Sequence, residues 1–268
     1  MADATVATLL SAATQRIDRL DAEILLANLL GTTRAWLFSH GEDPVPADRA
    51  ERLRARVERR AAGEPTALIL GVQDFWTLTL KVTGDTLIPR PDTELLVELA
   101  LQAPQSGPLT VLDAGTGSGA IAAALSSERP DWRVLASDCS IAALRVAACN
   151  CGKRVPLFCG SWLQCVAPRS VDMIVSNPPY IAEGDPHLDA LQFEPITALT
   201  SGADGLAAIG ELVEGSRETL RPGGWLLLEH GFDQGRQVKA LCESAGYTDV
   251  TVHTDLAGHE RATMAQWP

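Results

Sequence analysis

The chain contains the stretch Leu109-Thr110-Val111-Leu112-Asp113-Ala114-Gly115-Thr116-Gly117-Ser118-Gly119-Ala120, a short apolar run followed directly by a glycine-rich turn. Residues 121–125 then continue with the apolar character of a helix. A strand, a glycine turn and a helix in this order allow the backbone to approach a ligand at the helix N-terminus. A tight turn without a ligand is the alternative, and it accounts less well for the strand and helix on either side.

The ligand predicted for this turn contains a nucleoside. A second apolar run, residues 133–137, ends at Asp138, which lies at the distance downstream at which an acidic residue binds a ribose. Gly115, Gly117 and Ala120 also satisfy the dinucleotide pattern G-x-G-x-x-A. This half of the chain therefore leaves a nicotinamide dinucleotide and S-adenosylmethionine both open.

Strands and helices alternate through the rest of the chain, which predicts an α/β fold. We expect helices at residues 141–150, 206–220 and 234–244 and strands at residues 156–159, 171–176 and 225–229, with Arg221-Pro222-Gly223-Gly224 ending the second helix. Two runs, residues 247–253 and 261–266, close the chain as a hairpin. By analogy of fold, a hairpin at the end of a doubly wound sheet suits a methyltransferase that uses S-adenosylmethionine better than a dehydrogenase.

The strand at residues 171–176 ends in Asn177-Pro178-Pro179-Tyr180. Two prolines cannot continue a ladder of hydrogen bonds, and they fix two φ angles, so the chain leaves the sheet on a stiff backbone. An amide and a phenol are thereby held at the carboxyl edge of a strand, where open α/β sheets bind ligands. A proline-rich turn with a capping asparagine is the alternative interpretation.

The chemistry of this exit favours methyl transfer to a planar nitrogen. The lone pair of an amide or arylamine nitrogen is delocalised, so the group needs hydrogen-bond acceptors that grip its N–H groups and orient it. The side-chain oxygen of Asn177 and the carbonyl of Pro178 are two such acceptors on a rigid backbone. Tyr180 is expected to stack on the planar group and to exclude water.

The first 64 residues are expected to be helical, in three segments that include a helix at residues 47–62 with six arginines. The arginines suit either docking of an acidic partner or a solvated face, and the interleaved acids favour the solvated face. Residues 68–71 and 75–82 are predicted to form a hairpin, and Leu87-Ile88-Pro89-Arg90-Pro91-Asp92-Thr93-Glu94 enters a further helix. The predicted domains are residues 1–70 for partner recognition, residues 71–88 as a hairpin linker and residues 89–268 for methyl transfer.

Composition narrows the class of protein. The chain has 268 residues and a net charge of −12, which argues against gripping phosphate backbones by bulk electrostatics. Its six cysteines form no Cys-x-x-Cys pair, so we expect reduced thiols and no metal site. The N-terminus has no basic, signal-like region, and no apolar run reaches the length of a membrane span. These features predict a cytoplasmic protein with no membrane partner.

These motifs together resemble the protein-(glutamine-N5) methyltransferase family of the HemK/PrmC type, which modifies peptide-chain release factors. The Asn-Pro-Pro-Tyr motif alone is shared with adenine-N6 and other amino methyltransferases. The resemblance rests on its combination with further stretches: Gly63-Glu64-Pro65, Leu87 to Glu94, Leu112 to Ile121, Ser176 to Ile181, Phe193-Glu194-Pro195 and Leu227-Leu228-Glu229-His230-Gly231.

The resemblance implies a Rossmann-like sheet of seven strands with a small N-terminal helical domain, and a role in translation termination. S-adenosylmethionine would be bound by Gly115, Thr116, Gly117, Ser118, Gly119, Asp138, Trp162 and Asn177, with Asp138 on the ribose and Trp162 near the adenine. Asn177, Pro178, Pro179 and Tyr180 would bind the glutamine of the Gly-Gly-Gln motif of class 1 release factors, and Asn177, Pro178 and Tyr180 would be catalytic.

The chain departs from the family pattern in two places. Ser161 stands where the family usually has an aspartate before the tryptophan, and the segments 150–162 and 187–193 are short. Three rival functions remain: an amino methyltransferase acting on nucleic acid, a non-catalytic adaptor and a nicotinamide oxidoreductase. The acidic composition disfavours the first, and the glycines, Asp138 and Asn177 disfavour the second.

Overall fold

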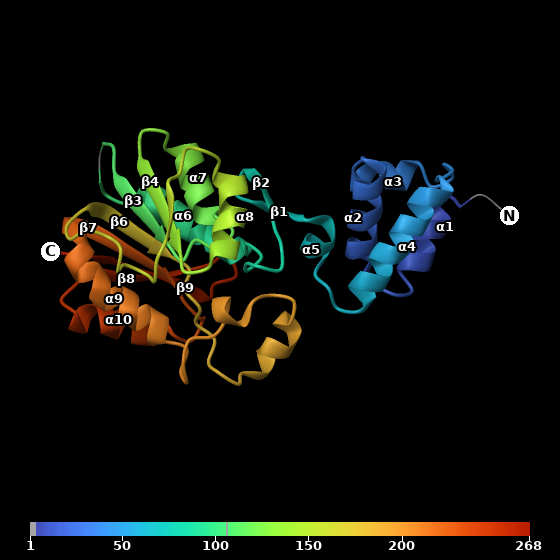
Figure 1. The fold of residues 1–268 in the computed structure, drawn as a ribbon. Helices are drawn as coiled ribbons and strands as arrows, with labels where there is room; N and C mark the ends of the chain where they lie inside the picture. The colour runs from blue at the N-terminus through green and yellow to red at the C-terminus, as the bar shows by residue number, and fades with distance from the viewer. Residues whose placement is uncertain (1–3, 106) are drawn as a thin grey trace. The chain divides into compact units, whose positions relative to one another are not determined.

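A computed structural model describes residues 4–105 and 107–268. The described chain divides into two compact units, which meet in the sequence between Val72 and Gln73. The first unit is helical and the second is built on a large sheet, as Figure 1 shows in blue and in green to red.

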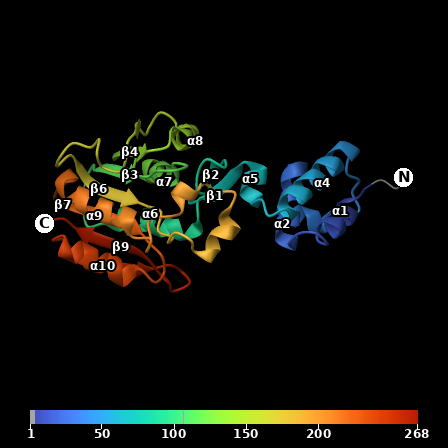
Figure 2. The same ribbon diagram turned by 60° about the horizontal axis from the view of Figure 1, so that its bottom comes forward.

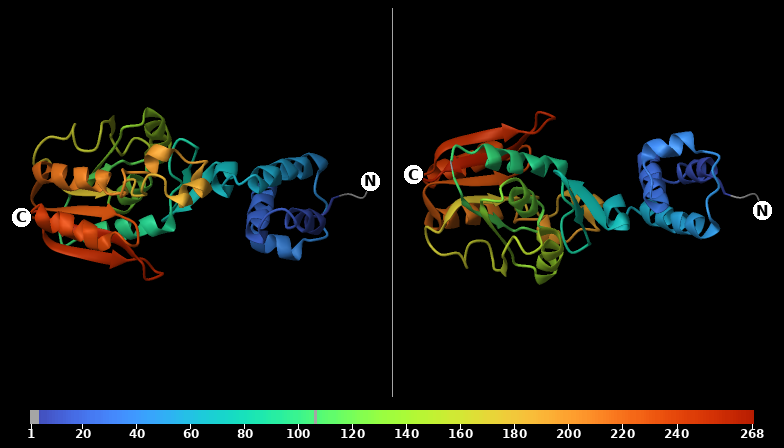
Figure 3. Two further views of the ribbon diagram at one scale, coloured as in Figure 1. Left: turned by 90° about the horizontal axis from the view of Figure 1, so that it is seen from below. Right: turned by 90° about the horizontal axis from the view of Figure 1, so that it is seen from above.

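The first unit is a small helical bundle (Figure 3). Its helices are α1 (Val6–Ala13), α2 (Arg19–Leu30), α3 (Arg34–Ser39), α4 (Ala47–Ala61) and α5 (Thr66–Leu70). Helix α2 packs against the other four and buries Leu25 and Leu26 completely. It ends at Gly31, whose φ of 70° is the left-handed conformation typical of a glycine C-cap. The sequence predicted α1, α2 and α4 but missed the short α3.

The hairpin that follows differs in part from the prediction. Residues 68–71 were expected as a strand, but residues 66–70 form α5, which begins after Pro65 and ends at Gly71 in the left-handed conformation. The hairpin pairs β1 (Val72–Phe75) with β2 (Leu78–Lys81) instead. Trp76 was expected within a strand and has a φ of 56° at the turn. A short apolar run between Pro and Gly is ambiguous between strand and helix, and the flanking residues favoured the helix here.

The second unit contains the predicted seven-stranded sheet, with the order β5-β4-β3-β6-β7-β9-β8. The strands are β3 (Thr110–Ala114), β4 (Arg133–Asp138), β5 (Leu157–Cys159), β6 (Val171–Ser176), β7 (Leu220–Glu229), β8 (Thr248–Thr254) and β9 (Glu260–Gln266). The first five are parallel to one another, and β9 runs antiparallel to both β7 and β8. The predicted terminal hairpin is therefore confirmed.

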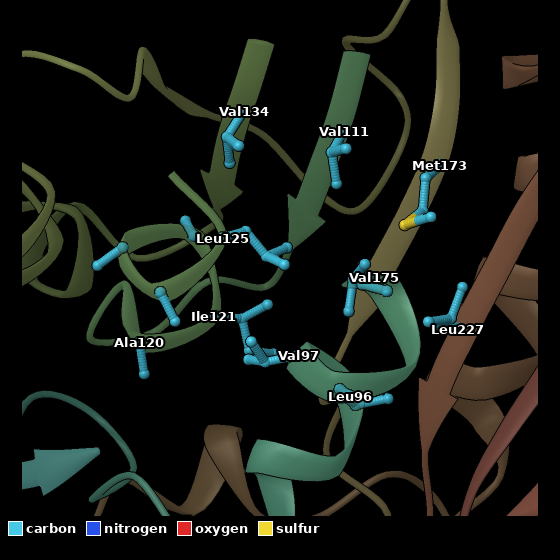
Figure 4. Close-up of a cluster of buried hydrophobic side chains, with 14 of the residues drawn as sticks. Leu96, Val97, Val111, Ala120, Ile121, Leu125, Val134, Met173, Val175 and Leu227 are labelled. Carbon is cyan, nitrogen blue, oxygen red and sulfur yellow. The ribbon is translucent and has the colours of Figure 1, made fainter. Parts of the chain in front are cut away.

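Helices cover both faces of this sheet (Figures 1 and 2). One apolar cluster joins the sheet to α6 (Glu94–Gln102), α7 (Ala120–Glu128) and the end of α8 (Ile141–Cys151), and a second joins it to α9 (Ala207–Thr219) and α10 (Gly235–Ser244). Figure 4 shows the first cluster, in which Val111, Met173 and Leu227 from three strands lie with Val97 of α6. Alternate residues of the central strands thus fill two separate cores.

The end of the helix before residue 221 was predicted correctly, but residues 221–224 were expected to lie outside the strand. Helix α9 ends at Thr219, and residues 221–224 form an irregular part of β7. Val171 pairs with Leu220 whereas Met173 pairs with Trp225, so four residues of β7 lie opposite one residue of β6 and three extra residues bulge from β7 between these pairs. A Cβ at Gly224 would lie 2.8 Å from the carbonyl oxygen of Arg221, which explains a glycine at this position.

The strand order places the ends of β3 and β6 side by side. The chain runs from β3 outward through β4 to β5 and then returns to β6 on the other side of β3. Such a reversal opens a crevice at the carboxyl edge of the sheet, where open α/β folds bind ligands. The glycine turn after β3 and Asn177 after β6 both lie at this point.

Candidate active site

A cavity of about 210 Å³ lies at this carboxyl edge. Its lining includes residues that follow three adjacent strands: Gly115, Thr116, Gly117 and Ser118 after β3, Asp138 at the end of β4, and Asn177 and Pro179 after β6. Trp162 also lines it. The structure therefore brings most of the predicted site residues to one cavity, although they are spread over 65 positions of the sequence.

The glycine turn is packed too closely for side chains at two positions. A Cβ at Gly115 would lie 2.9 Å from Cζ3 of Trp162, and a Cβ at Gly119 would lie 2.8 Å from Sγ of Cys151. Both glycines also have positive φ angles, 73° and 82°. Gly119 does not line the cavity, so its visible role is the close packing of the turn against α8.

Asp138, at the end of the neighbouring strand β4, forms a hydrogen bond with the glycine turn. Its Oδ2 accepts the backbone N–H of Gly117 at 2.9 Å, and its Oδ1 accepts the N–H of Ser140 at 2.8 Å. Each carboxylate oxygen has a second lone pair, so the group can still accept hydrogen bonds from a ligand in the cavity. The arrangement suits the paired hydroxyls of a ribose.

Asp113 fastens the turn to the helix behind it. It is fully buried and accepts the Thr116 hydroxyl at 2.6 Å and the N–H of Ala122 at 3.1 Å. Burial raises the pKa of Asp113 to about 7, and the nearby Asp138 acts in the same direction. Its Oδ1 has no hydrogen-bond partner among the described residues.

Asn177 is held by the strand before it and by a distant threonine. The Ser176 hydroxyl donates to the carbonyl of Ala114 at 2.6 Å, which ties the end of β6 to the end of β3. Asn177 Nδ2 donates to Thr93 Oγ1 at 3.0 Å. The side-chain oxygen of Asn177 makes no hydrogen bond within residues 4–105 and 107–268, so it remains available to a ligand at the cavity wall.

Pro178 and Tyr180 lie away from the cavity lining. Pro178 is buried, while the ring of Tyr180 packs against the core that includes α9 and α10. The Tyr180 hydroxyl donates to Glu229 Oε1 at 3.2 Å, and its carbonyl accepts Gln234 Nε2 at 3.0 Å. Burial raises the pKa of Tyr180, so the phenol stays protonated. These contacts brace the backbone that follows Asn177, and the stacking expected of Tyr180 stays a prediction.

The opposite wall of the cavity is formed by two segments that are far apart in the sequence and that the sequence analysis singled out as separate motifs. The lining here consists of Asp85, Thr86, Leu87, Pro89, Pro195, Thr197 and Ala198. The buried Glu194 connects them because it accepts the N–H of Ile88 at 2.7 Å and pairs with Arg90 at 2.5 Å. The Thr86 hydroxyl is buried here and lacks a partner among the described residues. Sequence reasoning missed Thr86, since a single threonine carries no periodic or motif signal.

The wall near Asp138 carries Trp162 and Ser161. Trp162 has a φ of 45°, which is unusual for a residue with a side chain, and its ring covers Gly115. Ser161 is exposed and lines the cavity beside it. A hydroxyl thus lies beside the tryptophan ring at this wall of the cavity.

The chain matches two family models. Residues 4–71 match the PrmC N-terminal domain, and residues 91–250 match the methyltransferase small domain. In the described part of the chain no helix has both the length and the apolar surface that crossing a membrane requires.

Similar curated proteins are release factor glutamine methyltransferases. That of Xylella fastidiosa (strain Temecula1) is 49% identical over 97% of both chains. That of Coxiella burnetii is 46% identical over 92% of this chain and 91% of its own, and that of Escherichia coli K12 is 44% identical over 93% and 92%.

Two solved structures share the fold. A methyltransferase from Pyrococcus furiosus aligns with a TM-score of 0.53 and 18% identity over 82% of this chain and 98% of its own. The hMettl16 catalytic domain, solved in complex with a MAT2A 3′UTR hairpin, aligns with a TM-score of 0.55 and 16% identity over 83% of this chain and 82% of its own.

Proposed function

The chain belongs to the family of release factor glutamine methyltransferases and is an S-adenosylmethionine-dependent methyltransferase, and we propose how its site performs this reaction. The methyl acceptor is the side-chain amide nitrogen (N5) of the glutamine in the Gly-Gly-Gln motif of class 1 peptide-chain release factors. The observation that carries the proposal is the fixed amide of Asn177, a residue that lines the cavity and whose side-chain oxygen makes no hydrogen bond to the described residues.

The residues of the cavity fit S-adenosylmethionine. Gly115 to Ser118 offer a backbone that a ligand can approach, Asp138 offers carboxylate lone pairs to the ribose, and Trp162 offers an aromatic face to the adenine. Asn177 would border the reactive end. When bound, the cofactor supplies an electrophilic methyl group on a sulfonium.

The methyl acceptor needs orientation more than it needs a base. An amide nitrogen attacks in line with the breaking carbon–sulfur bond only when its lone pair points at the methyl group. Asn177 Oδ1 and the Pro178 carbonyl would accept the two N–H groups of the substrate glutamine and hold its plane in place. Because Ser176 is hydrogen-bonded to Ala114 and Tyr180 to Glu229 and Gln234, the backbone that carries these two acceptors is held on both sides.

We assign residues 1–70 to recognition of the release factor, residues 71–88 to the linking hairpin and residues 89–268 to methyl transfer. The enzyme would act in the cytoplasm on a protein, with no direct contact with nucleic acid or membrane. The net charge of −12 supports a protein substrate over a nucleic acid.

The direct test is intact-mass analysis of a purified release factor after incubation with this protein and S-adenosylmethionine. We expect a gain of one methyl group, localised by peptide mapping to the Gly-Gly-Gln glutamine. A release factor whose glutamine is changed to alanine serves as the matched control and should gain nothing. Methylation of an added RNA or DNA in place of the release factor would overturn the proposal.

A further inference from the structure

Thr93 connects Asn177 to a buried carboxyl group. Thr93 is 4% exposed and lies at the end of the short 3₁₀ segment Pro91–Thr93, far in sequence from Asn177. Its hydroxyl accepts the hydrogen bond from Asn177 Nδ2 at 3.0 Å. The same hydroxyl lies near enough to the carboxyl of Glu229 to lower the pKa of that group, which favours its ionised form. Three segments thus meet through one hydroxyl behind the cavity.

Glu229 lies at the end of β7 and is 1% exposed. Its Oε1 accepts the Tyr180 hydroxyl, while its Oε2 has no hydrogen-bond partner that meets normal geometry among the described residues. Two further charged groups act on it: Arg261 of β9 favours ionisation and Asp92 opposes it. Burial raises the pKa of Glu229 to about 7, so the group is mainly a carboxylate at pH 8.5.

The carboxylate gives the chain of hydrogen bonds a direction. A carboxylate can only accept, whereas a threonine hydroxyl donates one hydrogen and accepts others. If the Thr93 hydrogen is directed to Glu229, its oxygen is left to accept, and only the Nδ2 end of Asn177 can donate to it. Oδ1 of Asn177, a residue that lines the cavity, is then left as an acceptor.

Orientation matters here because the two ends of a primary amide have almost the same shape and opposite hydrogen-bonding character. A reversed Asn177 would present N–H groups to the N–H groups of the substrate glutamine. We propose that Thr93 and Glu229 are positioning residues that fix the orientation of the Asn177 amide and so keep its oxygen toward the methyl acceptor. This inference rests on the function proposed above.

The test uses matched substitutions at Thr93 in the full-length protein. Thr93→Val keeps the β-branched shape and removes the hydroxyl, whereas Thr93→Ser keeps the hydroxyl. At pH 8.5 we expect Thr93→Val to lower kcat for release factor methylation about tenfold or more, with the Kd for S-adenosylmethionine unchanged within a few-fold. Thr93→Ser should restore kcat to within about threefold of the original protein. Glu229→Gln, which can both donate and accept, should behave as Thr93→Val does.

A second measurement does not depend on activity. The side-chain ¹⁵N–¹H₂ resonances of Asn177, assigned by their loss in Asn177→Ala, should shift in Thr93→Val and return near their original positions in Thr93→Ser. Unchanged kcat and unchanged resonances in Thr93→Val would overturn the inference, as would equal losses in the valine and serine variants accompanied by a lowered Tm. If the original protein leaves release factors unmethylated, the proposed function fails, while the resonances still report whether Thr93 orients Asn177.

Discussion

The Asn177 side chain is proposed to orient the methyl acceptor. Its removal should therefore impair methyl transfer and leave cofactor binding largely unchanged. We expect Asn177→Ala to lower kcat for release factor methylation about 100-fold or more, because the lost acceptor acts on the nucleophile as it attacks. The Kd for S-adenosylmethionine, measured by calorimetry, should change by no more than a few-fold. A variant that methylates at close to the original rate would show that another group orients the substrate amide.

Asp113 should make stability depend on pH. The folded protein keeps a proton on this carboxyl up to about pH 7, whereas the unfolded chain releases it near pH 4. Between these values the folded state binds more protons, so the free energy of unfolding falls as the pH rises. In Asp113→Asn this contribution is absent.

We therefore expect the free energy of unfolding, measured by urea titration, to fall less from pH 5 to pH 8 in Asp113→Asn than in the original protein. The difference should be about 2 kcal/mol. Each protein is compared with itself at two pH values, so any cost of the substitution that is independent of pH cancels. Equal pH dependence in both proteins would show that Asp113 is not protonated in the folded state.

At single positions, the sequence predicted the residues of the motifs. It did not predict the other residues that line the same cavity or form hydrogen bonds with them. Asn177, Asp138 and the glycine turn were predicted because local strand and turn patterns place them at a sheet edge. Thr86 was not, and the contact between Thr93 and Asn177 joins residues 84 positions apart. Such contacts depend on tertiary packing and have no fixed spacing.

At the level of elements, hydrophobic periodicity predicted the strands of the sheet and the helices that cover it. The errors lie where the local preferences of the residues conflict with the structure that forms. Residues 221–224 contain Pro and two glycines, which normally end an element, yet the register change between β6 and β7 absorbs them as a bulge. Residues 66–70 formed a helix because Pro65 and Gly71 cap a run too short to show a period. In the first place, pairing with β6 outweighed the preference of these residues for a turn. In the second, the capping residues produced a helix where a strand was expected.

The segments around Arg90 and Glu194 form one wall of the cavity, and a single carboxyl group joins them. Glu194→Gln keeps the shape but loses a charged acceptor for Ile88 and Arg90, so we expect the free energy of unfolding to fall by about 1–3 kcal/mol. The affinity for S-adenosylmethionine should fall as well, since residues next to both bonded segments line the cavity, among them Pro89 and Pro195. Thermal unfolding and calorimetry measure the two effects.

Glu214→Gln is the control for this change, because it removes an acid from the exposed pair between Glu214 and Arg217. Exposed pairs contribute little to stability, so this variant should resemble the original protein in both measurements. If Glu194→Gln also matched the original protein, the wall would not depend on the buried pair.

At the scale of the whole molecule, several arginines of α4 form ion pairs or hydrogen bonds within the helical unit that contains them. Arg60 pairs with Asp21 of α2 at 2.7 Å, Arg59 pairs with Glu64, and Arg56 donates to Asn28 at 2.9 Å. These contacts connect α4 to its neighbours. They favour the solvated face that the sequence analysis preferred over a docking surface, although the acids that pair with these arginines lie on other segments and not on α4.

Arg52 and Arg54 test that interpretation, because both are exposed and neither forms an ion pair with the described residues. If α4 is a solvated face, the double variant Arg52→Glu, Arg54→Glu should change the KM for the release factor by no more than about twofold, as expected when exposed charges contribute little. The kcat and the Tm should also stay close to those of the original protein. A rise of the KM by tenfold at unchanged kcat, diminishing at high salt, would instead identify α4 as an electrostatic docking surface for an acidic partner.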